Sequence, residues 1–521
     1  MEKKQYKDHY LPFAKSRLIE TSRLLENILE PAGNYQKPLK EQKLSLKFFS
    51  KILGISQQTI GPTLSFEKSN QDYPLPLKWL PIINYLKERK IIQDIYFEPL
   101  YHDEPKIFRT KIVSSRDPKL TDGVQPRTGS YTHGDSLDLD EAISKVIGEL
   151  LERFPLTIYR EKDFLKASLN DLKKGNKDYL DINHLAGFSK KQKEKNAYFQ
   201  FDENTNFLWT KGKSLLTKKN VLMPAQLVFW NYNFAHQSWR EPLLRESNTN
   251  GASGHYTLTE AILAGIYELI QRDGFLIYWF NKQAPPQIDI KTIDCQPLKD
   301  LVVECQSLGL KIHFYNTTTE IGIPSCICTV LDHSNAGPKI SMGGGCSLDW
   351  PKMLLRSLIE VLGVHHWLRD LKTERKEDYS YLDKTYQPFQ SFSIKQATRL
   401  GLWANQKMFK HFQFFLKGKN ESLEEVKKKF PQFSSPEEEL NYLIKKFKSL
   451  GQGYEISYYQ AEHQALKDLG YFSVKVIIPT LVTLYLNEPY AVLGAKRLKE
   501  VPRKLGFRPA KKWNYWPHPF P

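Results

Sequence analysis

Two predicted helices in this chain of 521 residues repeat one short pattern of charged residues. The first copy reads ELLER at residues 149–153, and the second reads ELIQR at residues 268–272. In both helices the apolar side chains recur on one face, so the charged pattern falls on the opposite face. A single Glu with an Arg four residues later is usually an exposed ion pair. Because two helices repeat the pattern in the same phase, we interpret the two copies as parts of one site.

The second copy follows a loop of small residues that supports this interpretation. The loop, SNTNGASGHY at 247–256, precedes Thr257, which with Glu260 forms the capping-box pattern of a helix start. Backbone N–H groups at such a position favour anions. Carboxylates that face each other from two helices suit Mg²⁺, which takes oxygen ligands at about 2.0–2.1 Å and usually joins one or two acids to substrate phosphates. The pattern therefore predicts a magnesium site whose neighbouring arginines contact phosphate oxygens.

The composition of the chain changes near residue 105. Residues 1–105 are rich in lysine, contain helical patterns and carry no chemical motif, so we expect a small, mainly helical N-terminal domain of unknown role. Over residues 106–521, strand-like runs alternate with long amphipathic helices, which predicts a larger α/β or α+β domain. The expected strands include 275–280, 311–318, 326–332 and 472–482, and the expected late helices are 393–415 and 435–449, the second with Ser435 as its N-cap.

Composition and charge restrict the class of protein. The chain has no run of 18 apolar residues and no signal-peptide pattern at its start, so we expect a cytoplasmic protein that does not enter a membrane. Its five cysteines show neither a C-x-x-C pair nor zinc-ligand spacing, which favours free thiols. The net charge of +17 is compatible with nucleic acid, but the sequence contains no nucleic-acid-binding motif. A positive groove for an anionic nucleotide or an acidic peptide explains the charge equally well.

Three stretches of the chain resemble the signature blocks of the YcaO family. They are DLDEAISKVIGELLERF at 138–154, SNTNGASGHYTLTEAILAGIYELIQRDGFLIYWF at 247–280 and SLDWPKMLLRSLIEVLG at 347–363. The resemblance covers roughly residues 106–521. It implies a YcaO-type ATP-binding fold of mixed sheets and helices, with ATP and Mg²⁺ as cofactors. Members of this family use the ATP to activate an oxygen of the peptide backbone.

The resemblance also assigns roles to individual positions. It implies that Mg²⁺ on the ATP phosphates is held by Glu149, Glu152 and Glu268, with Gln271 in a fourth place where the family usually has Glu. The residues that would lie against the nucleotide are Ser253, His255, Glu260, Arg153, Arg272, Arg356 and Glu360. Of these, Arg272 and Arg356 would also stabilise the transferred phosphoryl group. Because glutamine still offers a carbonyl oxygen, we predict a modified but active site.

The last residues of the chain narrow the class of enzyme. They read PHPFP at 517–521, a stiff segment with few hydrogen-bond donors. Within the YcaO family such a terminus resembles that of the azoline-forming cyclodehydratases, in which it reaches into the active site. Those enzymes convert Cys, Ser or Thr of a ribosomal precursor peptide into thiazoline or oxazoline. The resemblance implies that the terminal carboxylate of Pro521 accepts a proton during this reaction.

The resemblance further implies partner proteins. We expect a precursor peptide with a core of Cys, Ser or Thr, a separate E1-like or ocin-ThiF-like protein that binds its leader, and in some systems a flavin dehydrogenase. A homodimer would also fit the family. Two alternatives stay open. One is a YcaO-type enzyme that forms a thioamide or amidine with an external nucleophile, and the other is a non-catalytic peptide-binding subunit of such a complex.

Overall fold

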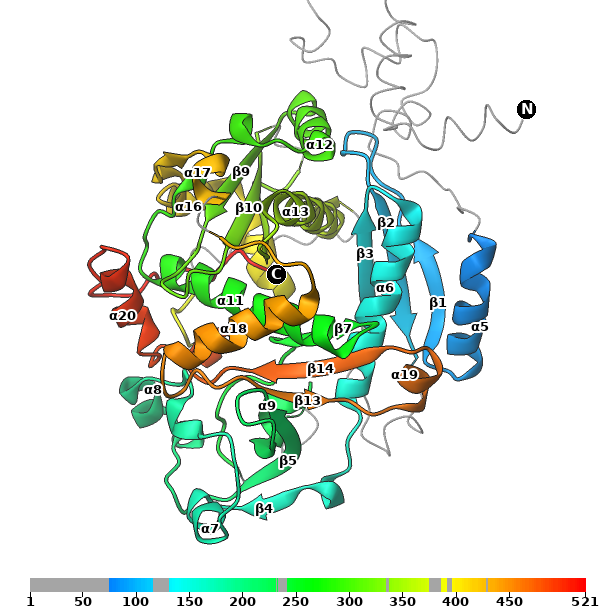
Figure 1. Cartoon of the computed structure of the whole chain (residues 1–521). Helices are drawn as coiled ribbons and strands as arrows, with labels where there is room; N and C mark the ends of the chain where they lie inside the picture. Colours follow the sequence, from blue (N-terminus) through cyan, green and yellow to red (C-terminus); the bar gives the residue numbers. More distant parts are fainter. Residues whose placement is uncertain are drawn as a thin grey trace, which may run out of the picture.

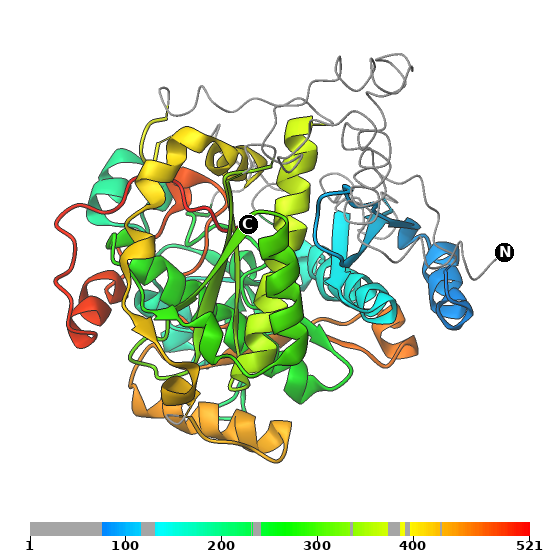
Figure 2. The same cartoon turned by 90° about the horizontal axis from the view of Figure 1, so that it is seen from above.

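The computed structural model describes residues 75–115, 131–230, 232, 241–333, 337–373, 386–390, 396–427 and 430–521. Over these residues the fold is α+β, with three sheets and the helices that pack between them (Figures 1 and 2). Residues 1–74, which make up most of the expected N-terminal domain, lie outside the described part. No helix in the described part is long and apolar enough to cross a membrane.

The first sheet is small and antiparallel. Its strands are β1 (Ile92–Phe97), β2 (Phe108–Ser114) and β3 (Tyr131–Ser136), in that order. Helix α5 (Leu80–Glu88) precedes β1 and packs beside it (Figure 1). The domain boundary that we expected at residue 105 falls between β1 and β2, which are paired. The described residues before that boundary therefore share a sheet with those after it.

The second sheet has six strands, all paired antiparallel in the order β4-β5-β13-β14-β7, with β6 also on β5. The strands are β4 (Leu165–Ala167), β5 (Phe207–Ser214), β6 (Asn220–Pro224), β7 (Ala252–His255), β13 (Ser457–Gln460) and β14 (Phe472–Ile477). The expected strand 472–482 is thus confirmed over its first half. Strand β7 brings the end of the small-residue loop to the edge of this sheet.

The third sheet has the order β11-β10-β9-β8-β12 and is antiparallel except where β8 pairs with β12. Its strands are β8 (Gln287–Ile288), β9 (Leu310–Asn316), β10 (Ser325–Asp332), β11 (Ile340–Cys346) and β12 (Asn420–Glu421). Every residue of β10 is buried because its alternate side chains enter two different apolar cores. The five cysteines are free thiols, as predicted.

Three long helices occupy the space between the sheets. They are α6 (Leu139–Arg153), α11 (Leu258–Phe280) and α13 (Trp350–Thr373). Helix α6 packs on β2 and β3 and also contacts β7 and β14, while α13 packs on β10 and β11. Helix α11 contacts both larger sheets and lies at the centre of the molecule (Figure 1). Asp138 and Thr257 cap α6 and α11 by accepting a backbone N–H three residues later.

Two secondary-structure predictions were wrong. Residues 275–280, expected as a strand, continue α11, and all six side chains are buried. A segment that is apolar on all sides shows no 3.6-residue period, so its sequence resembles that of a buried strand. The expected helix 393–415 is interrupted after α15 (Gln396–Ala404), because the Asn405 side chain accepts the N–H of Lys407 and starts a 3₁₀ turn. Helix α18 (Pro436–Ser449) begins at its predicted cap, Ser435.

Candidate active site

The charged pattern of α6 is held by one ion pair and one backbone hydrogen bond. Glu149 Oε1 lies 2.6 Å from Arg153 Nη2, four residues along the helix. Glu149 Oε2 accepts the backbone N–H of His133, in β3, at 2.7 Å. The guanidinium of Arg153 lies over the ring of Trp230, 5.8 Å from its centroid. The first acid of the pattern therefore has a fixed orientation toward β3.

The pattern of α11 has the same two contacts. Glu268 Oε1 lies 3.2 Å from Arg272 Nη2, and Glu268 Oε2 accepts the backbone N–H of Gly251 at 2.5 Å. Gly251 has a φ of +77°, and a Cβ at this position would lie 2.3 Å from the carbonyl oxygen of Val476. Only glycine fits here without strain. The small-residue loop is thus needed to bring a backbone donor to Glu268.

Glu268 lies within electrostatic range of acids on both other helices. Burial raises the pKa of the Glu152 carboxyl to about 8 against the effect of Arg153, and the charges of Glu268 and Glu149 add to the rise. Burial likewise raises the pKa of Glu360, on α13, to about 7, with Arg272 opposing and Glu268 adding to the rise. The structure therefore brings Glu149, Glu152, Glu268 and Glu360 into one electrostatically coupled cluster.

Gln271 completes the second copy of the pattern in a buried position. Its side chain is 4% exposed, and its Oε1 accepts a hydrogen bond from Arg272 Nη1 at 2.8 Å. Its Nε2 has no hydrogen-bond partner among the described residues. The backbone of Gly344 passes close to this nitrogen, since a Cβ on Gly344 would lie 2.6 Å from it. The fourth position of the predicted metal set is therefore inside the cluster but neutral.

The predicted nucleotide contacts around β7 interact with the start of α11. Ser253 Oγ donates to the carbonyl oxygen of Ala261 at 2.6 Å. His255 Nδ1 lies 2.8 Å from Glu260 Oε2, which also accepts the Thr257 hydroxyl at 2.6 Å. Arg356 lies apart from these residues on an exposed face of α13, one helical turn before Glu360 and within electrostatic range of the first turn of α6. Contacts of these residues with a nucleotide stay predictions.

The C-terminal segment ends beside the charged pattern of α11. The Arg272 guanidinium lies over the ring of Phe520, 4.4 Å from its centroid. Phe520 and His518 are fully buried, whereas Pro521 is partly exposed. The chain end also lies near the centre of the molecule in two perpendicular views (Figures 1 and 2). The predicted proline-rich tail thus reaches the acid cluster.

Side chains from a distant helix hold the backbone of this tail. The Trp403 indole N–H donates to the carbonyl of Pro517 at 2.8 Å, and Arg399 Nη2 donates to the carbonyl of Phe520 at 3.2 Å. Arg399 Nη1 donates to the carbonyls of Tyr485 and Leu486. Arg399 is fully buried, so these hydrogen bonds replace the water that its charge has lost. Sequence reasoning missed this arginine because nothing local distinguishes it.

Sequence reasoning also missed Lys475, in the middle of β14. Its side chain is 3% exposed, and its Nζ donates to the carbonyl of Asn248 at 2.6 Å. Burial lowers the pKa of Lys475 to about 8, against the opposing charges of Glu268 and Glu152. A single lysine in an otherwise apolar run of strand residues was the signal that could have revealed it.

The acid cluster fits Mg²⁺ by its chemistry, although its conformation here is not that of a closed metal site. Within the described residues, no three side chains of His, Cys, Asp or Glu lie close enough together to hold a metal ion. The first acid of each helix is paired with its own arginine instead. The Glu152 carboxyl accepts no hydrogen bond within the described residues, and burial raises its pKa, with the charges of Glu268 and Glu149 adding to the rise. Carboxylate oxygens that lack a donor are the ligands that Mg²⁺ prefers.

A family profile described as YcaO cyclodehydratase, ATP- and Mg²⁺-binding, matches residues 133–482. The chain belongs to the YcaO family. The matched region contains most of β3, all three long helices and the small-residue loop, so the acid cluster lies wholly within it. Members of this family bind ATP and Mg²⁺. The tail at 517–521 lies outside the matched region.

Solved structures confirm the YcaO fold. The chain is similar to a heterocyclase in complex with substrate and cofactor, with a TM-score of 0.63 and 18% identity over 89% of this chain and 61% of that one. It is also similar to YcaO from Methanopyrus kandleri bound with AMPPCP and Mg²⁺, with a TM-score of 0.56 and 16% identity over 80% of this chain and 94% of that one. At these identities the likeness establishes the fold.

Similarity to curated proteins is confined to a shorter stretch. An uncharacterized protein in the tfuA 3′ region of Rhizobium leguminosarum bv. trifolii is 28% identical over 164 residues, which make up 29% of this chain and 37% of the relative. A second relative, from Methanothermobacter thermautotrophicus, is 26% identical over 161 residues. The chain spans about two fifths of the length of the curated relatives it matches.

Proposed function

We propose that this YcaO protein is an ATP-dependent cyclodehydratase that converts Cys, Ser or Thr of a precursor peptide into thiazoline or oxazoline. The observation that carries the proposal is the contact between Phe520 and Arg272, which joins the C-terminal tail to the acid cluster. An ATP- and Mg²⁺-binding family supplies the phosphoryl donor, and a tail at the cluster is the feature that favours ring formation over the other family reactions.

The proposed reaction removes one water from the peptide for each ring. The Cys, Ser or Thr side chain adds to the preceding backbone carbonyl carbon and gives up its proton, and the former carbonyl oxygen takes the γ-phosphoryl group of ATP with release of ADP. Loss of phosphate breaks the carbon–oxygen bond, and loss of the amide proton leaves a C=N bond in the ring. The products are the azoline, ADP and phosphate. Phosphorylation is needed because an amide oxygen is otherwise a poor leaving group.

The residues of the chain would divide this work by position. Glu149, Glu152 and Glu268, with the Gln271 carbonyl, would hold Mg²⁺, which neutralises charge on the phosphates when bound. Arg153 follows Glu152 and Arg272 follows Gln271, so both arginines would donate to phosphate oxygens beside the metal. Electrostatic stabilisation and positioning are the main contributions of a protein to phosphoryl transfer. No side chain has to act as a covalent nucleophile.

The tail would supply the proton acceptor. Its backbone is fixed by Trp403 and Arg399, and its last ring is fixed against Arg272. These contacts leave the terminal carboxylate of Pro521 at the partly exposed end of a buried segment. A carboxylate with a fixed position next to the site is suited to accept the amide proton. Arg356, which is exposed on α13 and within electrostatic range of Glu141 on α6, would also contact the phosphates.

Partner proteins would deliver the peptide. We propose a precursor peptide with a Cys, Ser or Thr core, a separate E1-like or ocin-ThiF-like protein for its leader, and in some systems a flavin dehydrogenase that oxidises the azolines. A homodimer would be compatible with this arrangement. We further propose that residues 1–105 contain the small N-terminal domain expected from composition, of which residues 75–105 pack with the first sheet.

The proposal is tested by measuring ADP release and peptide mass together. Purified protein with its genomically neighbouring precursor peptide and leader-binding protein should release ADP in a peptide-dependent way and lower the peptide mass by about 18 Da per ring. The Glu149→Gln variant should lose both activities, whereas Glu437→Gln on the exposed start of α18 should keep them. A gain of about 16 Da with added sulfide would instead show thioamide formation. No ADP release with any peptide, and no Mg-ATP binding, would identify a non-catalytic subunit.

A further inference from the structure

One face of this protein carries many exposed cations and few acids, and we call it the basic face. Its residues come from two short segments, 406–419 and 496–512, and Glu500 is the only acid in either segment. The exposed cations are Lys407, Lys410, Lys417, Lys419, Lys496, Lys499, Arg503, Lys504, Arg508, Lys511 and Lys512. The net charge of the whole chain is +17, so these two segments account for most of the excess.

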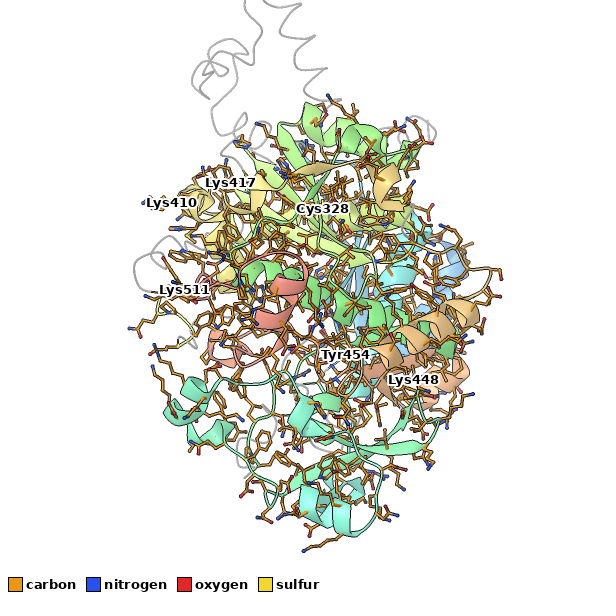
Figure 3. All side chains as sticks on the ribbon, turned by 60° about the vertical axis from the view of Figure 1, so that its left-hand side comes forward. Cys328, Lys410, Lys417, Lys448, Tyr454 and Lys511 are labelled. Atoms are coloured by element: carbon orange, nitrogen blue, oxygen red, sulfur yellow. The ribbon has the colours of Figure 1, made fainter. Side chains whose placement is uncertain are left out.

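The two segments meet at the C-terminal end of α11. The ring of His411 lies 4.4 Å from that of Trp516, and Lys282 Nζ lies 6.0 Å from the ring centroid of Phe414. Asn281 joins the second segment, since its Oδ1 accepts the N–H of Ala510 and its Nδ2 donates to the carbonyl of Leu498. Lys410, Lys417 and Lys511 lie on the same side of the molecule (Figure 3). Helix α20 (Arg497–Lys504) forms the lower part of this face (Figure 1).

Within the described part of the chain, the cations of the basic face have almost no acidic partners. Among them, within the described residues, only Lys504 has an ion pair, a 3.9 Å contact with Glu320. The buried Arg497 shows the contrast, because it pairs with Asp273 and Glu320 at 2.6 Å each. Basic residues in the last turn of α20 also stabilise the end of that helix, which accounts for Arg503 and Lys504. In the first segment Lys407, Lys410 and Lys417 also lie in last turns, but of elements only three or four residues long.

The tail of the chain connects this face to the acid cluster. It leaves the face where Asn514 donates its N–H to the carbonyl of Phe280, and it reaches Arg272 at Phe520. Eight residues of α-helix separate Arg272 from Phe280, the last residue of α11, a distance of about 12 Å at 1.5 Å per residue. An extended peptide covers that distance with roughly four residues. A peptide held on the basic face would therefore have its next residues within reach of the cluster.

We propose that the basic face docks an acidic segment of the peptide substrate next to the residues that are modified. This inference rests on the proposed function. Rows of unpaired cations attract a chain of carboxylates and orient it before close contact forms. Single-stranded nucleic acid is favoured less, because it needs aromatic side chains among the cations for base stacking. Within the two segments Phe409, Phe414 and Phe507 are partly buried against the core, so they do not form exposed stacking platforms.

The test measures binding without catalysis. The probe is a fluorescent synthetic peptide with six Glu residues separated by Gly and followed by Gly-Cys-Gly, with a Gln-for-Glu peptide and a 20-nucleotide RNA as comparison ligands. A face variant carries Lys410→Glu, Lys417→Glu and Lys511→Glu. A matched control variant carries the same change at three exposed lysines elsewhere: Lys190→Glu, Lys445→Glu and Lys448→Glu. Thermal stabilisation by Mg-ATP confirms that each variant is folded and retains the cluster.

We expect the face variant to bind the Glu peptide at least about tenfold more weakly than the unsubstituted protein and the control variant do. The affinity of the unsubstituted protein should fall as salt rises, and the Gln peptide should bind weakly to all forms. Equal binding by the face and control variants, or equal binding of Glu and Gln peptides, would overturn the inference. Tighter binding of RNA than of the Glu peptide to the face would also overturn it. Failure of the proposed function would appear separately, as absence of ADP release and ring formation.

Discussion

The charged patterns of α6 and α11 make the same three kinds of contact. In each helix the leading Glu pairs with the Arg four residues later and accepts one backbone N–H from a neighbouring segment. In each helix that Arg also lies over an aromatic ring, Trp230 for α6 and Phe520 for α11. Two local sequences of the same form therefore build two half-sites of the same form.

The halves differ in what lies at the second acid position and in where the aromatic ring comes from. Glu152 gives α6 a second carboxylate, whereas Gln271 gives α11 a neutral amide whose NH₂ group has no partner within the described residues. The ring over Arg153 belongs to a partly buried Trp at residue 230, while the ring over Arg272 belongs to the end of the chain. The α6 half thus carries more negative charge, and the α11 half connects the site to the tail.

Removing the charge of Glu268, which acts on acids of both other helices, should lower the activity most. Glu268→Gln removes the acid that acts on both Glu152 and Glu360, and it weakens the contact with Arg272. We expect peptide-dependent ADP release to fall by at least about a hundredfold. Steady-state ADP measurement checks this, with Glu437→Gln as the control. Activity close to that of the control would exclude Glu268 from the metal set.

Removing the aromatic ring over each arginine should affect ring formation differently in the two halves of the site. Phe520→Ala removes the only described ring over Arg272 and loosens the tail, so we expect ring formation to fall by about tenfold or more while stabilisation by Mg-ATP persists. Trp230→Ala, on the α6 side, should leave ring formation within about threefold of the wild type, because its ring is further from the guanidinium. Peptide mass analysis measures ring formation, and thermal unfolding measures the stabilisation by Mg-ATP. Equal losses in both variants would show that the tail has no special role.

The buried charge of Glu152 should make the stability of the free protein depend on pH. The pKa of this carboxyl is about 8 in the folded protein, above its ordinary 4.5, so folding favours the protonated form. The free energy of unfolding that the protonated Glu152 carboxyl contributes is therefore lost as pH rises from about 4.5 through 8. Glu152→Gln, measured without Mg²⁺, should leave stability nearly unchanged at pH 5 but raise it by about 1–3 kcal/mol at pH 9, a range reduced for partial exposure. Denaturant unfolding checks this, and an equal gain at both pH values would contradict it.

Restoring the missing acid should have the smallest effect on activity. Gln271→Glu keeps the oxygen that accepts from Arg272 Nη1 and replaces an amide N–H that has no partner in the described residues. We expect Mg²⁺ to bind about two- to fivefold more tightly, and the metal-free protein to be less stable at high pH, since another buried carboxylate joins the cluster. Isothermal titration with Mg-ATP measures the first effect. Weaker magnesium binding would show that Gln271 does not face the metal.

Much of the site could be predicted from short stretches of sequence. The phases of α6 and α11 and the cap at Thr257 depend on residues within a few positions of one another. Such features follow from helical periodicity and local hydrogen bonding. Local sequence also produced the wrong strand prediction for 275–280, because a helix that is buried on every side shows no periodic pattern of apolar residues.

The sequence by itself determined that two helices of matched phase would carry acids and arginines on their polar faces. Only the tertiary structure decided that these faces meet, that Lys475 enters the cluster from β14, and that Arg399 and Trp403 hold the tail against Arg272. Arg399 and Phe520 are 121 residues apart in the chain. Contacts over such separations leave no periodic trace in the sequence, because they depend on how the sheets and helices pack around one buried centre.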